Sequence, residues 1–174
     1  MSIGKHHTRS DNSKDEWLTP QYITNALGPF DLDPCSPIER PWETAKKHLT
    51  IKDDGLWPLW NPDDFIWMNP PYGSNTGTWL ERLAEQNNGI ALVFARTETR
   101  MFFEHVWNKA ACILFISGRI TFYHVDGTPG KFTGGAPSVL IGYGTLAHYR
   151  MEVAIERGTI KGKLIALEPG GCNE

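Results

Sequence analysis

Short apolar runs alternate along this chain with segments whose apolar residues recur every three or four positions. The apolar runs predict strands, and the unbroken ones indicate strands covered on both faces; they are Phe65–Met68, Ile90–Ala95 and Ala110–Ile116. Phe30–Asp33, in which apolar and acidic residues alternate, predicts one more strand. The periodic segments predict amphipathic helices, and they are Gln21–Leu27, Trp42–Leu49, Thr78–Asn87 and Thr99–Lys109. This alternation favours an α/β fold with a mostly parallel sheet.

The last third of the chain predicts an antiparallel hairpin that closes one edge of the sheet. Its two strands are Gly118–Tyr123 and Ser138–Tyr143, and the glycine-rich segment Asp126–Gly135 joins them. A helix over His148–Glu156 and a last strand over Lys163–Leu167 complete the pattern.

The N-terminal segment differs in composition from the rest of the chain. Residues 1–15 are polar and almost without apolar side chains, which predicts a mobile arm followed by a single domain over residues 16–174. Pro20 suits a first helical position, with Thr19 or Asp15 as the cap of that helix. Two adjacent histidines in the arm have no defined geometry, so we expect no metal site.

Charge and cysteine usage narrow the functional classes. The 174 residues carry 17 basic and 20 acidic side chains, a formal net charge of −3. This excludes a basic coat over the whole surface, so contact with a nucleic acid needs a local basic patch. The 3 cysteines form no Cys-x-x-Cys pair, and no apolar run is long enough to span a membrane. We therefore expect a soluble cytoplasmic protein.

The segment Asn69-Pro70-Pro71-Tyr72 directly follows the predicted strand Phe65–Met68. Its residues suit methylation of a planar amino group such as the exocyclic amine of adenine. That amine is a poor nucleophile until acceptors at its two hydrogens localise the lone pair on nitrogen, and the Asn69 side-chain oxygen and the Pro70 carbonyl supply two acceptors. The prolines fix the direction of that carbonyl, and Tyr72 offers a ring for stacking of an extruded base.

Three polar clusters follow predicted strands and therefore meet at one edge of the sheet. They are Asp33-Pro34, Asn69–Tyr72 and Ala95–Thr97. Ligands of α/β sheets bind beyond the carboxyl ends of the strands, so this edge is the predicted site.

The same residues belong to a wider resemblance. The stretches EWLTP, FDLDPCSP, PWETAKKHLTIKDDGL, FIWMNPPYG, ALVFARTETRMFF, GRITFYHVDG and GGAPSVLIGYG run in this order from Glu16 to about Gly144. Together they resemble the phage-type DNA N-6-adenine methyltransferases, the Dam-like family of phages and prophages. The resemblance implies a compact Rossmann-like fold, S-adenosylmethionine as cofactor, adenine flipped out of double-stranded DNA as substrate, and a bacterial host.

The resemblance also implies roles for individual residues. Asn69, Pro70, Pro71 and Tyr72 match the motif that holds the acceptor amine. The residues that match cofactor-binding elements are Trp17, Thr19, Pro20, Asp33, Pro34, Cys35 and Asp54. A carboxylate at Asp33 can pair with the ammonium group of the cofactor. The chain lacks a Gly-x-Gly-x-Gly turn, and Glu39 or Glu43 is the candidate partner of the cofactor ribose.

The candidates for substrate contact lie outside the motif. Trp79 could wall the base pocket, and the residues that could hold phosphates are Arg96, Arg119 and Lys131. Cys35 lacks a nearby histidine in the sequence, so a covalent nucleophile is not expected. Two alternatives stay open: an amino or amide methyltransferase acting on RNA guanine or a protein glutamine, and a non-catalytic phage protein that binds S-adenosylmethionine or DNA. The sequence leaves the methylated site and the oligomeric state open.

Overall fold

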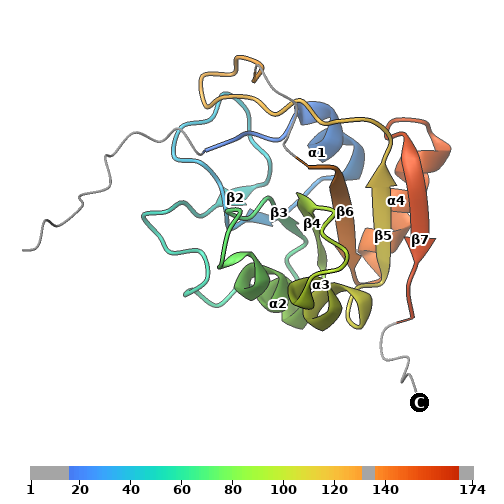
Figure 1. The fold of residues 1–174 in the computed structure, drawn as a ribbon. Coiled ribbons are helices and arrows are strands. Elements are labelled where there is room, and N and C mark those ends of the chain that lie inside the picture. The colour runs from blue at the N-terminus through green and yellow to red at the C-terminus, as the bar shows by residue number, and fades with distance from the viewer. Residues whose placement is uncertain (1–15, 131–135, 169–174) are drawn as a thin grey trace, which may run out of the picture.

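The fold is a seven-stranded sheet with helices on both faces, seen in a computed structural model that describes residues 16–130 and 136–168 (Figure 1). The strand order is β2-β1-β3-β4-β6-β5-β7. The strands are β1 (Leu32–Asp33), β2 (Lys47–His48), β3 (Ile66–Met68), β4 (Gly89–Phe94), β5 (Cys112–Ile116), β6 (Ser138–Tyr143) and β7 (Gly162–Ala166).

Helices cover the sheet on both sides. Within the described residues, four are α-helices: α1 (Gln21–Leu27), α2 (Thr76–Gln86), α3 (Arg100–Phe102) and α4 (Thr145–Glu156). A π-helical turn, η1 (Phe103–Trp107), continues α3. The predicted helices over residues 21–27, 78–87, 99–109 and 148–156 are therefore confirmed, the first with its predicted bounds and the other three with shifted ends.

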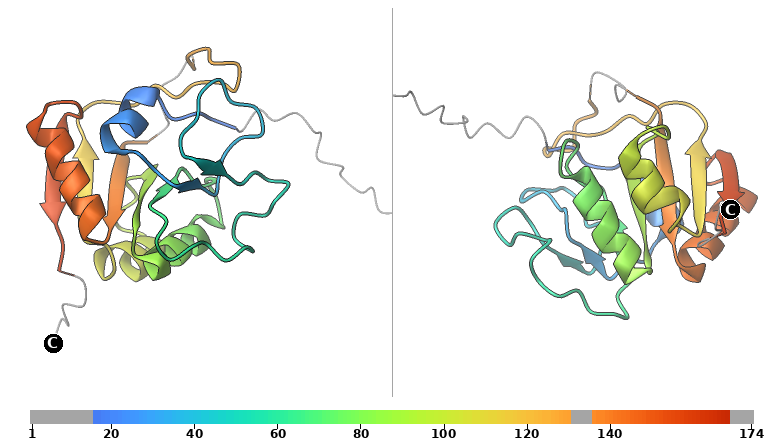
Figure 2. Two further views of the ribbon diagram at one scale, coloured as in Figure 1. Left: turned by 180° about the vertical axis from the view of Figure 1, so that it is seen from behind. Right: turned by 60° about the horizontal axis from the view of Figure 1, so that its bottom comes forward.

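Each face of the sheet has its own hydrophobic core. Ile66, Met68 and Val93 point to the face that α2, α3 and η1 cover. Trp67 and Leu92, which alternate with them, point to the face that α1 and α4 cover, seen from behind in Figure 2. Strands buried on both faces explain why these apolar runs are unbroken.

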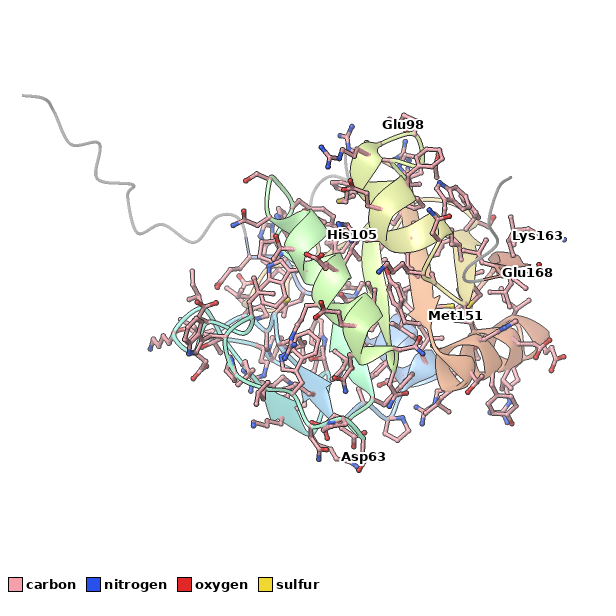
Figure 3. All side chains as sticks on the ribbon, turned by 90° about the horizontal axis from the view of Figure 1, so that it is seen from below. Asp63, Glu98, His105, Met151, Lys163 and Glu168 are labelled. Atoms are coloured by element: carbon pink, nitrogen blue, oxygen red, sulfur yellow. The ribbon has the colours of Figure 1, made fainter. Side chains whose placement is uncertain are left out.

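Figure 3 shows both layers from below, with the side chains drawn. His105 of η1 lies between the α2 helix and the η1 turn, close to Gly77 of α2. Met151 of α4 lies on the opposite face, where its sulfur contacts the Cys112 sulfur at 3.6 Å. Helix α2 and the η1 turn thus pack on one another, whereas Met151 packs α4 on strand β5 of the sheet.

The sheet is not mostly parallel, so that prediction is wrong. Parallel pairing joins β2, β1, β3 and β4, whereas β4–β6, β5–β6 and β5–β7 are antiparallel and join more residues. The parallel half carries the ends of β1, β3 and β4, where the candidate site was predicted. The prediction holds for that half of the sheet alone.

The predicted hairpin between residues 118–123 and 138–143 is also wrong. All of β6 is buried, and it lies between β4 and β5 with both of its edges paired. Residues 118–123 contain no strand; Tyr123 makes single bridges to Leu18 and to Pro129. A fully buried apolar strand gains more from a central position than from an edge, because both faces and both edges leave water.

Two local predictions near the N-terminus fail as well. The segment 42–49 is not a helix, and its end forms β2 beside β1. Pro20 takes the N-cap position of α1 without any side-chain cap bond, so Thr19 does not cap that helix. Asp15 and the rest of the predicted arm lie outside the described residues.

Candidate active site

Asn69 follows β3 and has its side chain held from a distant part of the chain. Its Nδ2 donates to the backbone carbonyl of Trp17 at 3.3 Å, 52 positions earlier in the sequence. This bond assigns the orientation of the amide and leaves Oδ1 as a free acceptor, apart from the Tyr72 hydroxyl at 3.5 Å. A contact of that length is weak, so Oδ1 retains its capacity for another donor.

Tyr72 stacks on the end of the neighbouring strand. Its ring lies 4.1 Å from the ring of Phe94, the last residue of β4, with an interplanar angle of 18°. Tyr72 is 39% exposed, so part of its surface stays open to solvent. Desolvation raises the pKa of its hydroxyl, which is therefore protonated at neutral pH.

The start of α2 fixes the turn between the two motif prolines and the helix. The Thr76 hydroxyl donates to the Pro71 carbonyl at 2.9 Å and accepts from the Gly73 amide at 3.0 Å. Thr76 is 5% exposed, and Pro70 is buried. The motif backbone is therefore held at both ends, by the end of β3 and by the first turn of α2.

The N-terminal segment reaches this edge through the loop that follows β5. Leu18 exchanges two backbone hydrogen bonds with Tyr123, at 2.8 and 3.0 Å. The Trp17 ring lies 4.6 Å from that of His124 and also contacts Gly130. These contacts place the Trp17 carbonyl where it can hold Asn69.

Thr19 carries a polar atom without a partner. Its side chain is 2% exposed, and its hydroxyl oxygen has no hydrogen bond among the described residues. A buried hydroxyl without a partner is costly, which indicates that a bound ligand or water completes it. Pro20, next to it, is also buried.

Asp33 ends β1 with a fully buried carboxylate. One oxygen accepts from the Cys35 amide at 3.0 Å, and the other accepts from the Thr44 hydroxyl. Burial raises the pKa of Asp33 to about 6, although these hydrogen bonds oppose the rise. Burial, followed by the charge of Asp33, raises the pKa of the Cys35 thiol well above its usual range, which disfavours the thiolate form.

The Asp54 loop packs against the turn that follows β1. A Cβ added to Gly55 would lie 2.0 Å from the Pro34 carbonyl oxygen, so the two backbones touch. Asp54 is exposed, has a φ of 47°, and accepts from the Trp57 amide at 2.8 Å through its carbonyl. The structure therefore brings Gly55, the neighbour of the predicted cofactor residue Asp54, against Pro34, another of the predicted cofactor residues.

The two candidates for the ribose lie differently. Glu43 is committed to internal contacts, because one carboxylate oxygen accepts from Arg40 and from His48, both at 3.0 Å. Glu39 is exposed. Of the two, Glu39 has the more accessible carboxylate, because the Glu43 carboxylate already accepts from Arg40 and His48.

The predicted substrate residues are dispersed. Trp79 is 8% exposed and packs in the core beneath Gly55, so its role in a base pocket stays a prediction. Arg96 is exposed directly after β4, and Arg119 is exposed in the segment after β5. Lys131 lies outside the described residues.

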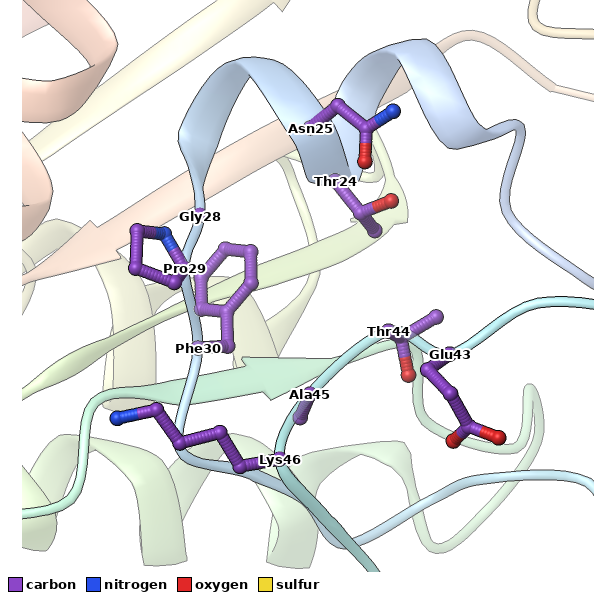
Figure 4. A pocket seen from close by; sticks show the side chains of 9 residues that line it. All are labelled: Thr24, Asn25, Gly28, Pro29, Phe30, Glu43, Thr44, Ala45 and Lys46. Atoms are coloured by element: carbon purple, nitrogen blue, oxygen red, sulfur yellow. The ribbon is translucent and has the colours of Figure 1, made fainter.

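A groove of about 440 Å³ lies between the end of α1 and the segment that precedes β2 (Figure 4). It is bounded by the C-terminal end of α1, by Gly28–Phe30 and by Glu43–Lys46. None of the motif residues Asn69–Tyr72 lines it. We therefore place the candidate site at Asn69 and Tyr72, which carry the hydrogen-bond acceptor and the stacking ring, and not in this groove.

Two further findings concern the described residues alone. No helix in residues 16–130 and 136–168 is long and apolar enough to cross a membrane. Within the same ranges, no group of three His, Cys, Asp or Glu side chains could hold a metal ion.

The sequence pattern did not single out three residues of the candidate site: Phe94, Thr76 and Thr44. Phe94 was hidden because it ends an apolar run and looks like one more core residue. Thr76 acts through two hydroxyl bonds within the turn before α2, and Thr44 acts through one hydroxyl bond to Asp33, 11 positions earlier in the sequence. The only local signal was the spacing of Thr76 from the prolines, typical of a side chain that closes a turn.

Taken together, these contacts define an α/β protein whose candidate site lies at the carboxyl ends of parallel strands and presents an amide oxygen and a partly exposed aromatic ring. The chain belongs to the DNA N-6-adenine-methyltransferase (Dam) family, whose model matches residues 5–161. The resemblance drawn from the sequence is thereby confirmed. Membership supports DNA adenine methyltransferase activity and implies S-adenosylmethionine as methyl donor. No curated protein and no solved structure gives a significant match.

Proposed function

We propose that this protein transfers the methyl group of S-adenosylmethionine to the exocyclic amine of adenine in double-stranded DNA, with the base flipped out of the helix. The observation that carries the proposal is the tethered Asn69 amide. Its Nδ2 is held by the Trp17 carbonyl, and its Oδ1 stays available beside the ring of Tyr72. A preset acceptor next to a stacking surface is what recognition of a flat amine requires.

In this proposal, Asn69 and Pro70 activate the amine of the substrate. The Asn69 Oδ1 and the Pro70 carbonyl accept the two amine hydrogens, which localises the nitrogen lone pair. Because both acceptors are fixed before the substrate arrives, little reorganisation is needed at the moment of reaction. The product ammonium is acidic enough to lose its proton afterwards, so the proposal needs no general base.

Tyr72 holds the base in place. Flipping costs a few kcal/mol of stacking and pairing, and a new stack on an aromatic ring offsets part of that cost. Phe94 supports the Tyr72 ring from below and so restricts its rotation. Arg96, Arg119 and Lys131 are the proposed phosphate contacts beside the flipped base.

The residues present fit the cofactor. Thr19 offers a buried hydroxyl that lacks a partner, and the turn after Asp33 lies against the Asp54 loop. We propose that Trp17, Thr19 and Pro20 contact the methionine end of the cofactor, that Asp33, Pro34 and Cys35 hold its ammonium region, and that Asp54 lies near its adenine. When bound, the cofactor supplies an electrophilic methyl group on sulfur.

The architecture supports a Rossmann-like methyltransferase half. Strands β2, β1, β3 and β4 run parallel, and three groups of proposed contact residues, Asp33–Cys35, Asn69–Tyr72 and Arg96, lie at or just after the ends of β1, β3 and β4. The resemblance to phage-type enzymes makes a phage or prophage origin, and action in the cytoplasm of a bacterial host, part of the same proposal.

The deciding experiment is transfer of a labelled methyl group from S-adenosylmethionine to unmethylated duplex DNA, followed by digestion to nucleosides. Label in N-6-methyl-2′-deoxyadenosine is the expected result. Label in RNA guanine or in a protein glutamine, with none in DNA, would move the function to another amino or amide methyltransferase. Cofactor binding with no transfer to any of these acceptors would leave a non-catalytic binding protein.

A further inference from the structure

The loop between β1 and β2 folds around one buried histidine. His48, the last residue of β2, has a side chain 7% exposed. Its Nδ1 lies 3.0 Å from a Glu43 carboxylate oxygen, and its Nε2 accepts from the amides of Thr44 and Ala45, both at 3.2 Å. One imidazole therefore satisfies three consecutive residues of a loop that has no helix or strand of its own.

These hydrogen bonds define the tautomer of the His48 imidazole. Since Nε2 accepts two backbone N–H groups, it carries no proton, and Nδ1 must be the donor to Glu43. Burial, together with the charge of Arg40, lowers the pKa of His48 and so favours the neutral ring at neutral pH. Arg40 fixes Glu43 from the other side at 3.0 Å and also donates to the Pro37 carbonyl.

The same network reaches the predicted cofactor edge. Thr44, whose amide is held by His48, donates its hydroxyl to Asp33. Asp33 in turn accepts from the Cys35 amide and so shapes the turn that follows β1. A continuous path of hydrogen bonds thus runs from Glu43 through His48 and Thr44 to Asp33.

We propose that His48 and Thr44 are positioning residues that set the Asp33–Ser36 turn in the conformation that binds the cofactor. The inference rests on the proposed function, which puts this turn at the ammonium region of S-adenosylmethionine. Neither side chain touches the reacting atoms. Their effect is on cofactor affinity, with little effect on the rate of the bound complex.

Two pairs of substitutions separate positioning from general stability. Thr44→Val keeps the shape of the side chain and removes its hydroxyl, whereas Thr44→Ser keeps the hydroxyl. His48→Leu removes the acceptor, whereas His48→Gln keeps an acceptor at a similar reach. His148→Leu on α4, a helix outside this loop, controls for the loss of a histidine.

The measurement is the dissociation constant of S-adenosylmethionine by calorimetry, with steady-state methylation beside it. We expect Thr44→Val and His48→Leu to weaken cofactor binding at least tenfold, and to raise the cofactor KM alike. We expect kcat at saturating cofactor and the KM for DNA to stay within threefold. Thr44→Ser, His48→Gln and His148→Leu should bind within threefold of wild type.

Several outcomes would overturn the inference. One is that the two variants of each pair bind S-adenosylmethionine with equal affinity. Another is that a variant loses cofactor binding and DNA binding in parallel, which indicates general unfolding. If His48→Leu fails to fold by circular dichroism, the Thr44 pair decides. Wild-type protein that binds cofactor but methylates no DNA would refute the proposed function and leave this test intact, whereas wild-type protein that binds no cofactor would refute both.

Discussion

At the scale of single residues, the orientation of the Asn69 amide is the most consequential detail. A free asparagine side chain rotates between donor and acceptor, and the bond from Nδ2 to the Trp17 carbonyl removes that freedom. Trp17 thereby contributes through its backbone, independently of any contact its ring makes with the cofactor.

Asn69→Ala tests the acceptor directly. We expect kcat to fall about 100-fold or more, because one fixed polar contact to the reacting group is lost. Cofactor affinity by calorimetry should stay within a few-fold of wild type. Single-turnover methylation of duplex DNA gives the rate, and an Asn69→Ala protein with wild-type turnover would remove the motif from the mechanism.

Tyr72 is expected to act through its ring and not through its hydroxyl. The hydroxyl lies 3.5 Å from the Asn69 Oδ1, too far for a strong bond. Tyr72→Phe should therefore change kcat/KM by less than about threefold, whereas Tyr72→Ala should cost about 1–3 kcal/mol of base stacking, seen as weaker capture of the flipped base. Fluorescence of 2-aminopurine at the target position reports that capture; an inactive Tyr72→Phe protein would contradict the prediction.

Phe94 supports Tyr72 from the neighbouring strand. Stacked aromatic pairs contribute about 0.5–1.5 kcal/mol beyond their burial. Phe94→Leu keeps an apolar side chain at the end of β4 but removes the stack, so we expect the KM for DNA to rise about threefold to tenfold. Phe94→Tyr keeps the ring and is the matched control. A similar rise in both variants would show that packing at β4, and not stacking, sets the effect.

At the scale of elements, the helical spacing of apolar residues in one segment competes with backbone hydrogen bonds to a distant strand. Residues 42–49 have the apolar spacing of a helix, which is why the sequence predicted one. In the structure the amides of Lys46, Lys47 and Leu49 donate instead to the carbonyls of Phe30, Asp31 and Asp33. Pairing with β1 satisfies these groups and places Thr44 against Asp33, which a helix there would not do.

The contact between the Asp54 loop and the turn after β1 is a second consequence of element packing. A Cβ at Gly55 would lie 2.0 Å from the Pro34 carbonyl oxygen, so Gly55→Ala must push the two segments apart. We expect about 1–3 kcal/mol lower stability in urea unfolding, and weaker cofactor binding by calorimetry.

The matched control for this substitution is Gly77→Ala in α2. There the added Cβ meets the nearest atom, Met101 Cγ, at 3.4 Å, an ordinary contact. Alanine also favours the helix, so stability should hold or rise. A Gly55→Ala protein as stable as Gly77→Ala would contradict the close packing of the two loops.

At the scale of the whole molecule, the buried Asp33 makes stability depend on pH. Its folded-state pKa of about 6 lies above the ordinary aspartate value of 3.8, so ionisation is disfavoured in the folded protein. The contribution of the protonated Asp33 side chain to the free energy of unfolding is complete below pH 3.8 and is lost as pH rises through about 6. A difference of about 2 pKa units corresponds to about 3 kcal/mol.

Asp33→Asn removes that titration. The difference in unfolding free energy, variant minus wild type, should therefore grow in favour of the variant by up to about 3 kcal/mol between pH 4 and pH 7.5. Urea unfolding of both proteins without cofactor measures it, and carboxylates such as Asp31, whose pKa is lowered by Lys46, cancel in the difference. A difference independent of pH would refute the buried, ionisable Asp33.

The sequence by itself determined most helices and strands, and the motif Asn69–Tyr72, because these depend on the local spacing of apolar and turn-forming residues. It also placed the polar clusters at strand ends. Family membership then followed from the order of the motifs along the chain.

The tertiary structure alone decided the neighbours of β6, the bond from Asn69 to Trp17, the stack of Tyr72 on Phe94 and the route from His48 to Asp33. Burial leaves a local trace in the sequence, since a buried strand must be apolar wherever it lies. The choice of partner leaves none, because backbone groups are alike in every residue, and only the packing of the whole chain selects which of them meet.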